Sequence, residues 1–416
     1  MNYTIRTILL LALVANACNG QAKKSTSERP GKTAQTVKTA IGDFTLPAPY
    51  ATASTTKRSS MVDWNGHKPI APKGFKVTKF AEDFERCRWI YQAPNLDIFV
   101  SDSFADQIVV FRDKDKDGHY ETRETFLKNL NRPFGILVLD NHFYVANTNG
   151  LYRYPYQNEL KLTAKGQKIL DLPAGGYNNH WTRNLLAAKD GSKIYVTVGS
   201  GSNVGENGMQ HEVRRACILE INPDGSGEKL YASGLRNPVG VDWNPVNGEL
   251  WTAVNERDGL GDDLVPDYIT SVQRGGFYGW PYAYFGQIVD PRLEGQRPDL
   301  VEQSIVPDVP VGSHTASLSV AFYTKDAFPS GYRSGAFVGQ HGSWNRANIS
   351  GYKVLFVPFK DGKPSGAPQD FLTGFVANAD RAEVYGRPVC VMVLHDGSLL
   401  VSDDGSNTIW QISAER

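Results

Sequence analysis

The chain is poor in cysteine and methionine, with four of each in 416 residues, and it has no excess of either charge. Its 44 Lys and Arg residues balance 44 Asp and Glu residues, which excludes a general attraction to nucleic acid or to an acidic membrane surface. Apart from Cys18, the odd and widely spaced set of Cys87, Cys217 and Cys390 is no disulfide framework, so we expect small buried side chains there. The absence of Cys-x-x-Cys-His excludes covalently attached haem, and no Gly-x-Ser-x-Gly, His-Glu-x-x-His or Walker motif is present.

Long hydrophobic runs are missing after the N-terminus, and the run at Ile8–Ala15 is too short to span a bilayer. We therefore expect residues 1–17 to be a signal peptide of an exported bacterial protein. Two processing alternatives remain. Ala15-Asn16-Ala17 fits ordinary cleavage and a periplasmic protein, whereas small residues before Cys18 resemble a lipobox that lacks its usual Leu. Residues 18–59 are polar and are predicted to form a flexible tether, which favours a membrane-anchored lipoprotein with its lipid on Cys18.

Glycine and aromatic residues are plentiful, with 40 Gly, 19 Tyr and 19 Phe, as is typical of a turn-rich β protein. One pattern, an apolar strand, a turn and a second apolar strand, recurs six times. The copies lie at 89–100, 134–145, 184–196, 239–251, 318–338 and 389–401. Each copy has room for a four-stranded blade, which predicts an all-β fold, a six-bladed β-propeller over residues 60–416. We expect the segment 75–80 to pair with the last strand and to close the ring.

In a propeller, the residues just before each innermost strand and just after each second strand gather at one end of the axis. An Arg or His precedes every blade, and this regularity favours a site for a small polyanion over charges that merely solvate loops. The first group is Arg88, Arg132, His180, Arg236, Asn237, His314 and Arg387. The second is Asp102, Asn147, Ser200, residues 255–263, Gln340, His341, Asp403 and Asp404.

An acidic loop at Asp113, Asp115, Asp117 and Glu124, with Gly118 at its turn, has the spacing of a calcium-binding EF-hand loop. Its flanks are predicted to be strands rather than helices. The segment is therefore predicted to be either a second Ca²⁺ site or a polar hairpin loop.

Several longer segments carry a resemblance to a known family. They are Gly234-Leu-Arg-Asn-Pro-Val-Gly240 with its continuation to Tyr268, Gly275-Gly-Phe-Tyr-Gly-Trp-Pro281, His180-Trp-Thr-Arg-Asn-Leu185, His314-Thr-Ala-Ser-Leu318 and Tyr385-Gly-Arg-Pro388. From about residue 75 to the C-terminus, the chain resembles the sorbosone dehydrogenase branch of the soluble aldose sugar dehydrogenases that depend on pyrroloquinoline quinone (PQQ).

The resemblance implies a six-bladed propeller that binds PQQ, a tricarboxylate quinone, together with Ca²⁺ on its axis. It implies that His180 is the general base that takes the sugar hydroxyl proton, and that Arg236 stabilises charge on the quinone. The cofactor-binding residues would be Arg132, Arg236, Asn237, His314, His341 and Arg387. The active-site calcium would lie at Arg257, Asp258, Asp262 and Asp263. Electrons would leave to a separate acceptor, because no haem motif is present.

The chain departs from the better-known glucose dehydrogenases of this group. Ser200 stands where an Asp orients the catalytic His, Val239 replaces a Gln, and a residue near His341 replaces a cofactor-binding Lys. A His without a carboxylate partner is a weaker base. Two alternatives to an aldose or aldehyde dehydrogenase therefore remain, a propeller that binds carbohydrate or protein without catalysis and a metal-dependent sugar lactonase.

Overall fold

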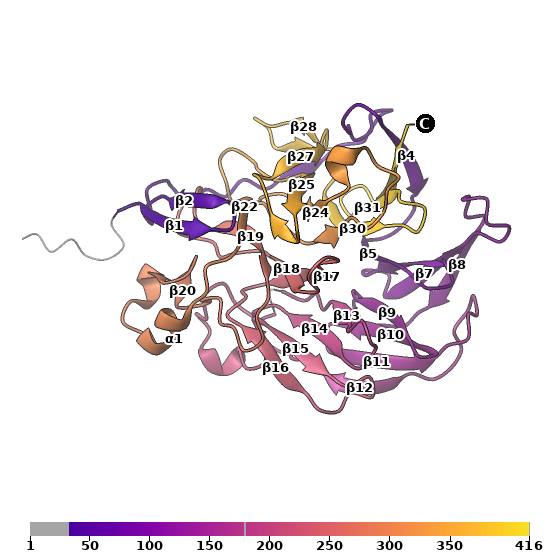
Figure 1. The fold of residues 1–416 in the computed structure, drawn as a ribbon, viewed down its shortest axis with the longest axis horizontal. Helices are drawn as coiled ribbons and strands as arrows, with labels where there is room; N and C mark the ends of the chain where they lie inside the picture. Colours follow the sequence, from indigo (N-terminus) through magenta and orange to yellow (C-terminus); the bar gives the residue numbers. More distant parts are fainter. Residues whose placement is uncertain (1–32, 179, 416) are drawn as a thin grey trace, which may run out of the picture.

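The fold is a series of six antiparallel sheets in a computed structural model that describes residues 33–178 and 180–415 (Figure 1). The first three sheets comprise β5 (Cys87–Gln92), β6 (Ile98–Asp102), β7 (Gln107–Arg112) and β8 (Thr122–Leu127); β9 (Ile136–Leu139), β10 (His142–Asn147), β11 (Gly150–Pro155) and β12 (Gln167–Asp171); and β13 (Leu185–Ala187), β14 (Ile194–Val198), β15 (Cys217–Ile221) and β16 (Lys229–Ser233). The last three comprise β17 (Pro238–Trp243), β18 (Leu250–Val254), β19 (Pro266–Ser271) and β22 (Val309–Ser313); β23 (Ala321–Phe322), β24 (Gly335–Gln340), β25 (Lys353–Lys360), β26 (Lys363–Pro364) and β27 (Gln369–Leu372); and β30 (Pro388–Val393), β31 (Leu399–Asp403), β32 (Thr408–Ala414) and β4 (Phe75–Ala81).

The six sheets are the blades of a propeller, as the repeat predicts. The innermost strand of each blade contacts that of the next, in the order β5, β9, β13, β17, β23 and β30, and β30 contacts β5 again. The N-terminal strand β4 pairs antiparallel with β32, so the last blade is built from both ends of the chain (Figure 1). This closure pairs the edge that β32 would otherwise expose.

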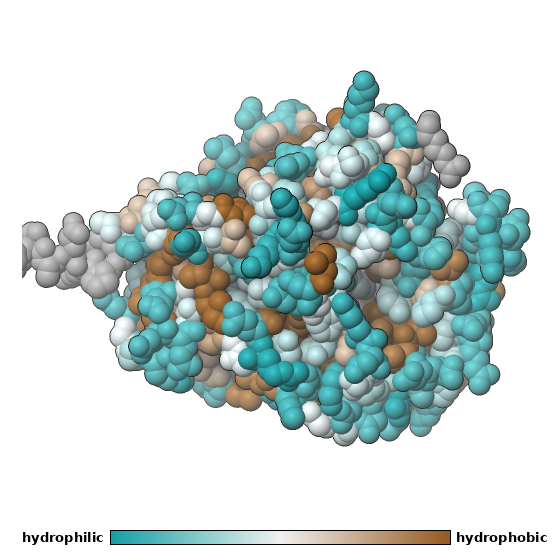
Figure 2. Space-filling model, viewed as in Figure 1, coloured by the Kyte–Doolittle hydropathy of each residue, from teal (hydrophilic) through white to brown (hydrophobic). Residues whose placement is uncertain are grey.

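The second strand of most blades is buried along its whole length, because the neighbouring blades cover both of its faces. Every residue of β6, β14, β18, β24 and β31 is buried. The apolar runs in the sequence therefore mark the interior of the ring. The outer surface is mostly hydrophilic in Figure 2. Within the part of the chain that the structure describes, no helix is long and apolar enough to cross a membrane.

The tether predicted over 18–59 is wrong for its described part. Strands β1 (Gln35–Thr39) and β2 (Gly42–Leu46) form a hairpin that packs beside the fourth blade. Leu46 is fully buried, and the Phe44 ring stacks on Phe285 with centroids 5.8 Å apart. These apolar side chains explain why the segment lies on the propeller despite its polar composition. The predicted signal peptide 1–17 and Cys18 lie outside the described residues.

The longest departure from the blade pattern is an insertion between β19 and β22. It contains β20 (Ala283–Tyr284), β21 (Ile288–Val289), the 3₁₀ turn η2 (Pro291–Leu293) and helix α1 (Pro298–Gln303). A small sheet of β28 (Val376–Asn378), β29 (Glu383–Val384) and the N-terminal β3 (Ser60–Met61) precedes the last blade. Two further 3₁₀ turns are η1 (Met209–His211) and η3 (Ser330–Tyr332).

Candidate functional site

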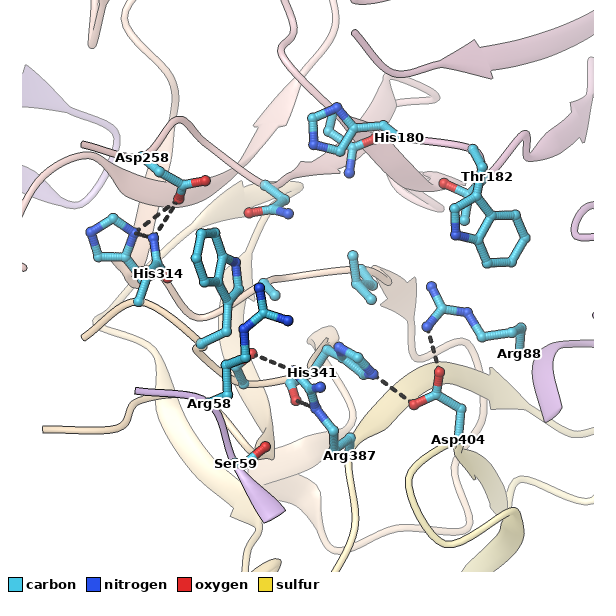
Figure 3. A pocket seen from close by; sticks show the side chains of 18 of the residues that line it. Arg58, Ser59, Arg88, His180, Thr182, Asp258, His314, His341, Arg387 and Asp404 are labelled. Carbon is cyan, nitrogen blue, oxygen red and sulfur yellow. Dashed lines mark hydrogen bonds and ion pairs between the residues drawn. The ribbon is translucent and has the colours of Figure 1, made fainter. Parts of the chain in front are cut away.

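A cavity of about 820 Å³ opens where the loops before the inner strands meet the loops after the second strands (Figure 3). Five arginines, three histidines and two aspartates are among its lining residues, and the excess of arginine over aspartate makes its wall cationic. The sequence-predicted residues that line it are His180, Arg236, Asn237, Asn255, Asp258, His314, His341, Arg387, Arg88 and Asp404. The blade period therefore brings most of the predicted ring together.

His180 is held as a neutral imidazole with one nitrogen free. Its Nδ1 lies 2.9 Å from the Ser200 carbonyl oxygen and 3.0 Å from Ser200 Oγ, while the Ser200 hydroxyl donates to the Ser202 carbonyl. Because a carbonyl only accepts, Nδ1 carries the proton and Nε2 is the acceptor. Burial, and next the charge of Arg236, hold the pKa of His180 well below its ordinary value of 6.5. The Ser200 carbonyl thus orients this histidine without the carboxylate that the family pattern supplies.

Arg236 is buried beneath this histidine, and its N–H groups are all donated to the protein. Nε donates to the Asn203 carbonyl, Nη1 to the carbonyls of Asn255 and Glu256, and Nη2 to Asn203 Oδ1 and Asp258 Oδ2. Arg236 therefore brings positive charge to the cavity rather than a free donor. Arg236 can therefore stabilise charge on the quinone, as predicted, only through its own positive charge and not by donating a hydrogen bond.

Asp258 lies between Arg236 and His314, and Figure 3 shows its carboxylate beside His314. Its Oδ1 lies 3.3 Å from His314 Nδ1 and accepts a hydrogen bond of 2.7 Å from Asn345 Nδ2. Burial lowers the pKa of His314, but the hydrogen bond and charge of Asp258 outweigh it, so the pKa is raised overall. Asp258 and His314 are therefore already paired with each other.

A second cluster surrounds Asp404. Arg88 Nη1 and His341 Nε2 each lie 2.6 Å from the buried carboxylate, and Arg86 Nη1 lies 3.7 Å away. Arg387 reaches the same place and donates from Nε and Nη2 to the carbonyls of His341 and Gly342. Burial, together with the charges of Arg88 and Arg86, lowers the pKa of Arg387. Three guanidinium groups thus face one carboxylate, which leaves positive charge uncompensated.

Unpartnered polar atoms show where an anion would fit. Within residues 33–178 and 180–415, Arg86 Nε, Arg88 Nε and Asn237 Oδ1 are buried and make no hydrogen bond. Buried polar atoms in native structures nearly always have partners. The guanidinium groups of Arg86, Arg88 and Arg387 therefore have the chemistry to hold a ligand that carries several carboxylates and carbonyls, and this fits the tricarboxylate cofactor, whereas Asn237 Oδ1 would accept from an N–H or O–H group of that ligand.

The predicted calcium ligands do not come together. Arg257 is fully buried away from the cavity, where it binds Glu256, Asp290 and the carbonyls of Pro281 and Ala283. The Arg257 side chain therefore ties the β18 loop to the insertion and supplies no ligand atom to the cavity.

Asp262 and Asp263 also have structural partners. The Asp262 carboxylate accepts hydrogen bonds of 2.8 Å from the backbone N–H groups of Thr55 and Ala347, and Asp263 pairs with Arg346 at 2.6 Å. Neither residue lines the cavity with Asp258. Of the four predicted calcium ligands, Asp258 is the one that lines the cavity.

Arg132 lies outside the cavity lining, although its position before β9 predicted otherwise. It is exposed, and its guanidinium lies 5.3 Å from the centre of the Phe104 ring and 5.9 Å from that of Trp181. These two aromatic side chains line the cavity, whereas Arg132 does not.

The acidic loop takes a different set of carboxylates from the predicted one. The carboxylates of Asp113, Asp115, Asp117 and Glu121 lie within 4.8 Å of one another. Glu124 instead lies in β8 opposite Val110. The loop joins β7 to β8, and Asp113 accepts from the N–H groups of Lys116 and Gly118, as in a polar hairpin loop.

Several lining residues were missed by sequence reasoning. They are Arg58, Ser59, Arg86, Phe104, Tyr177, Trp181, Thr182, Asn203, Ala316, Leu318, Gly342, Trp344 and Asn345. Arg86 and Trp181 stand one or two positions from predicted residues, so a wider window around each inner strand would have found them. Arg58 and Ser59 come from the segment predicted as tether, and no periodicity marks them.

A closed six-bladed propeller with a cationic cavity at one end of its axis defines the class of this protein. The chain belongs to the TrAA12-like family, whose model matches residues 69–268 and 298–415. A Borreliella burgdorferi protein described as uncharacterised is 29% identical over 359 residues, which cover 83% of this chain and 90% of that protein.

Two further comparisons carry descriptions of activity or fold. The pyrroloquinoline quinone-dependent sugar dehydrogenase of Hypocrea jecorina is 26% identical over 180 residues, covering 37% of this chain and 42% of that enzyme. The calcium structure of the Trichoderma reesei family AA12 enzyme superposes with a TM-score of 0.71 at 19% identity, covering 83% of this chain and 97% of that one. The second comparison supports the propeller fold.

Proposed function

We propose that this protein is a PQQ-dependent sugar dehydrogenase with His180 as its general base. The observation that carries the proposal is a buried, neutral imidazole, oriented through Nδ1 and free at Nε2, in a cavity lined by cations. The family and the Hypocrea jecorina relative support this reading. The resemblance to the sorbosone dehydrogenase branch belongs to the same proposal and favours an aldose or a related aldehyde as substrate.

The cluster around Asp404 would hold the cofactor. Arg88 and Arg387 would bind its carboxylates as charge-assisted donors, and Asn237 would meet a polar edge of the ring system. When bound, PQQ supplies a quinone that accepts a hydride from the carbon bearing the sugar hydroxyl. His180 Nε2 takes the hydroxyl proton as that hydride leaves, so the C–OH group becomes a carbonyl. Arg236 holds Asn203 and Asp258 in place, and its charge adds to the effect of burial, which lowers the pKa of His180 and keeps it unprotonated.

The two electrons then leave to a separate acceptor. A soluble or membrane-bound carrier fits, because the chain has no haem-attachment motif.

A reconstitution experiment tests the proposal. PQQ is added to the purified protein with and without Ca²⁺, bound cofactor is followed by absorbance, and reduction of a redox dye is measured with a panel of aldoses. We expect saturable binding and sugar-dependent dye reduction. Binding of sugars without dye reduction would favour the non-catalytic propeller, which the missing carboxylate partner of His180 keeps open as a second candidate. Hydrolysis of sugar lactones would favour the third reading, although Asp258 and Asp404 are both already paired.

Gly199 offers a test of the geometry at the base. A Cβ on this residue would come within 2.6 Å of His180 Cβ and would overlap Asn237 Oδ1. We expect Gly199→Ala to displace both side chains and to lower kcat for sugar oxidation by about 10- to 100-fold. Gly331→Ala is the matched control, because a Cβ there meets no atom within 4 Å. Equal kcat values for the two variants would show that the packing beside His180 does not matter.

Export and anchoring are part of the proposal and rest on the sequence alone. We expect Cys18→Ser to move the protein from the membrane fraction to the soluble periplasmic fraction, measured by immunoblot after cell fractionation. A wild-type protein that is already fully soluble would mean ordinary cleavage after Ala17.

A further inference from the structure

An N-terminal segment crosses the mouth of the cavity and supplies part of its wall. We call residues 50–62 the strap. It lies outside residues 69–268 and 298–415, which match the family model, yet Arg58 and Ser59 line the cavity. Figure 3 shows Arg58 on the other side of the cavity from Arg88. Part of the cavity wall therefore comes from outside the segments that the family model matches.

The strap is fastened along its length. Tyr50 N donates to the Leu260 carbonyl at 2.7 Å, and the strap ends in β3, which pairs in parallel with β29. In between, the Asp262 carboxylate accepts from Thr55 N and from Ala347 N, so one side chain joins the strap to the loop that carries Trp344. The next link is the Lys57 N–H, which donates to the Trp344 carbonyl at 2.9 Å. These contacts hold Arg58 at a fixed place on the cavity mouth.

Arg58 has an aromatic neighbour and no anionic one. Its guanidinium lies 5.7 Å from the centre of the Trp344 ring, and among residues 33–178 and 180–415 it forms no ion pair or side-chain hydrogen bond. Trp344 is 43% exposed, so part of its side chain remains accessible to a ligand. Phe104, which is 45% exposed, also lines the cavity, and the Arg86 guanidinium lies 4.6 Å from the centre of its ring.

The charges that line the cavity indicate which kind of ligand would bind at its mouth. Asp404 is bound by Arg88 and His341, and Asp258 by Arg236 and His314, so neither lining carboxylate is left to balance Arg58. A tricarboxylate cofactor would occupy the cluster at Asp404, which does not include Arg58. Aromatic faces bind the C–H side of sugar rings, and a guanidinium binds a carboxylate through paired donors.

We propose that the strap makes this protein selective for sugars that carry a carboxylate, such as hexuronic acids, with Arg58 as the carboxylate-binding residue and Trp344 as the surface under the ring. The proposal rests on the proposed dehydrogenase function and names its substrate class. Arg58 is exposed and can be changed without disturbing the core.

Kinetics of matched sugars test the proposal. We expect wild-type protein loaded with PQQ to oxidise D-glucuronate and D-galacturonate with a higher kcat/KM than D-glucose and D-galactose. Arg58→Gln is expected to lower kcat/KM for the acids by about 10- to 100-fold, mainly through KM, and to leave the neutral sugars within about twofold. Arg58→Lys should restore part of the loss, and added salt should weaken the preference. Arg381→Gln, at an exposed arginine outside the cavity lining, is the control.

Binding supplies a readout that needs no turnover. Methyl glucuronide, which has no free anomeric hydroxyl, is titrated calorimetrically into the wild type and into Arg58→Gln, with methyl glucoside as the neutral control. Binding by the wild type alone supports the carboxylate site, even if PQQ fails to bind and the dehydrogenase proposal falls. Equal binding by both proteins, a preference for neutral sugars, or a weaker affinity of Arg58→Gln for PQQ itself would overturn it.

Discussion

Replacing His180 by alanine is expected to lower turnover by about 10²- to 10⁴-fold, the usual contribution of a general base, while PQQ affinity stays close to that of the wild type. The loss arises because Nε2 is the acceptor that the cavity holds free, and the proton it takes moves only as the hydride leaves. The measurement pairs dye-reduction rates at saturating sugar with an absorbance titration of PQQ. His395→Ala is the control, since His395 lies exposed in the turn between β30 and β31. A variant that oxidises sugars as fast as the wild type would remove His180 from the mechanism.

The pH dependence of kcat gives a second test of the same residue. A general base must be neutral to accept a proton, and burial with the charge of Arg236 holds the pKa of His180 well below 6.5. Activity is therefore lost only as the pH falls through this lowered pKa. We expect the acid limb of the profile below pH 6.5. An acid limb above that value would mean that another group, or a protonated His180, controls the step.

Replacing Arg387 by glutamine is expected to weaken PQQ binding by about 10- to 100-fold, the value of a charge-assisted hydrogen bond. Arg387 is held by the carbonyls of His341 and Gly342 through Nε and Nη2, which leaves Nη1 for a ligand. Since this residue acts in binding, turnover at saturating PQQ should change far less than in His180→Ala. The measurement is the dissociation constant of PQQ, and Arg381→Gln again serves as control.

Thermal unfolding of Arg387→Gln checks that weaker PQQ binding does not come from loss of the folded structure. The lost hydrogen bonds to the two carbonyls lower stability by about 1 kcal/mol each, so the variant should remain folded at room temperature. An unchanged dissociation constant in a folded variant would place the cofactor away from the cluster around Asp404.

The blade repeat could be found in the sequence because the same residues recur for structural reasons. Asp102 and Asp403 end the second strands of the first and last blades, and their Oδ1 atoms accept the backbone N–H groups of Arg86 and Arg387. Each aspartate thus holds the loop that carries a cavity arginine. The repeat that the fold requires also positions the residues of the site. The sequence repeat therefore predicted both the blades and the site residues.

The parts that sequence reasoning missed depend on contacts between distant segments. Asp262 sits in a loop rich in carboxylates and was predicted to bind calcium, yet its partners are the N–H groups of Thr55 and Ala347. Arg58 lies in a polar segment without a period. The local sequence does not distinguish a carboxylate that anchors the strap from a carboxylate that binds a metal, because both are found in glycine-rich polar loops.

The last blade meets the first where β30 contacts β5, and the cluster at Asp404 spans this junction. Arg86 and Arg88 come from the start of the chain's first blade, whereas Arg387 and Asp404 come from its last, and Ser402 Oγ donates to the Arg88 carbonyl across the gap. A ligand bound there contacts the first and the last blade at once. Its binding energy adds to the stability of the closed ring, by about 2.7 kcal/mol when the ligand is at a hundred times its dissociation constant. Loss of the cofactor would remove this added stability from the contact between the first and last blades.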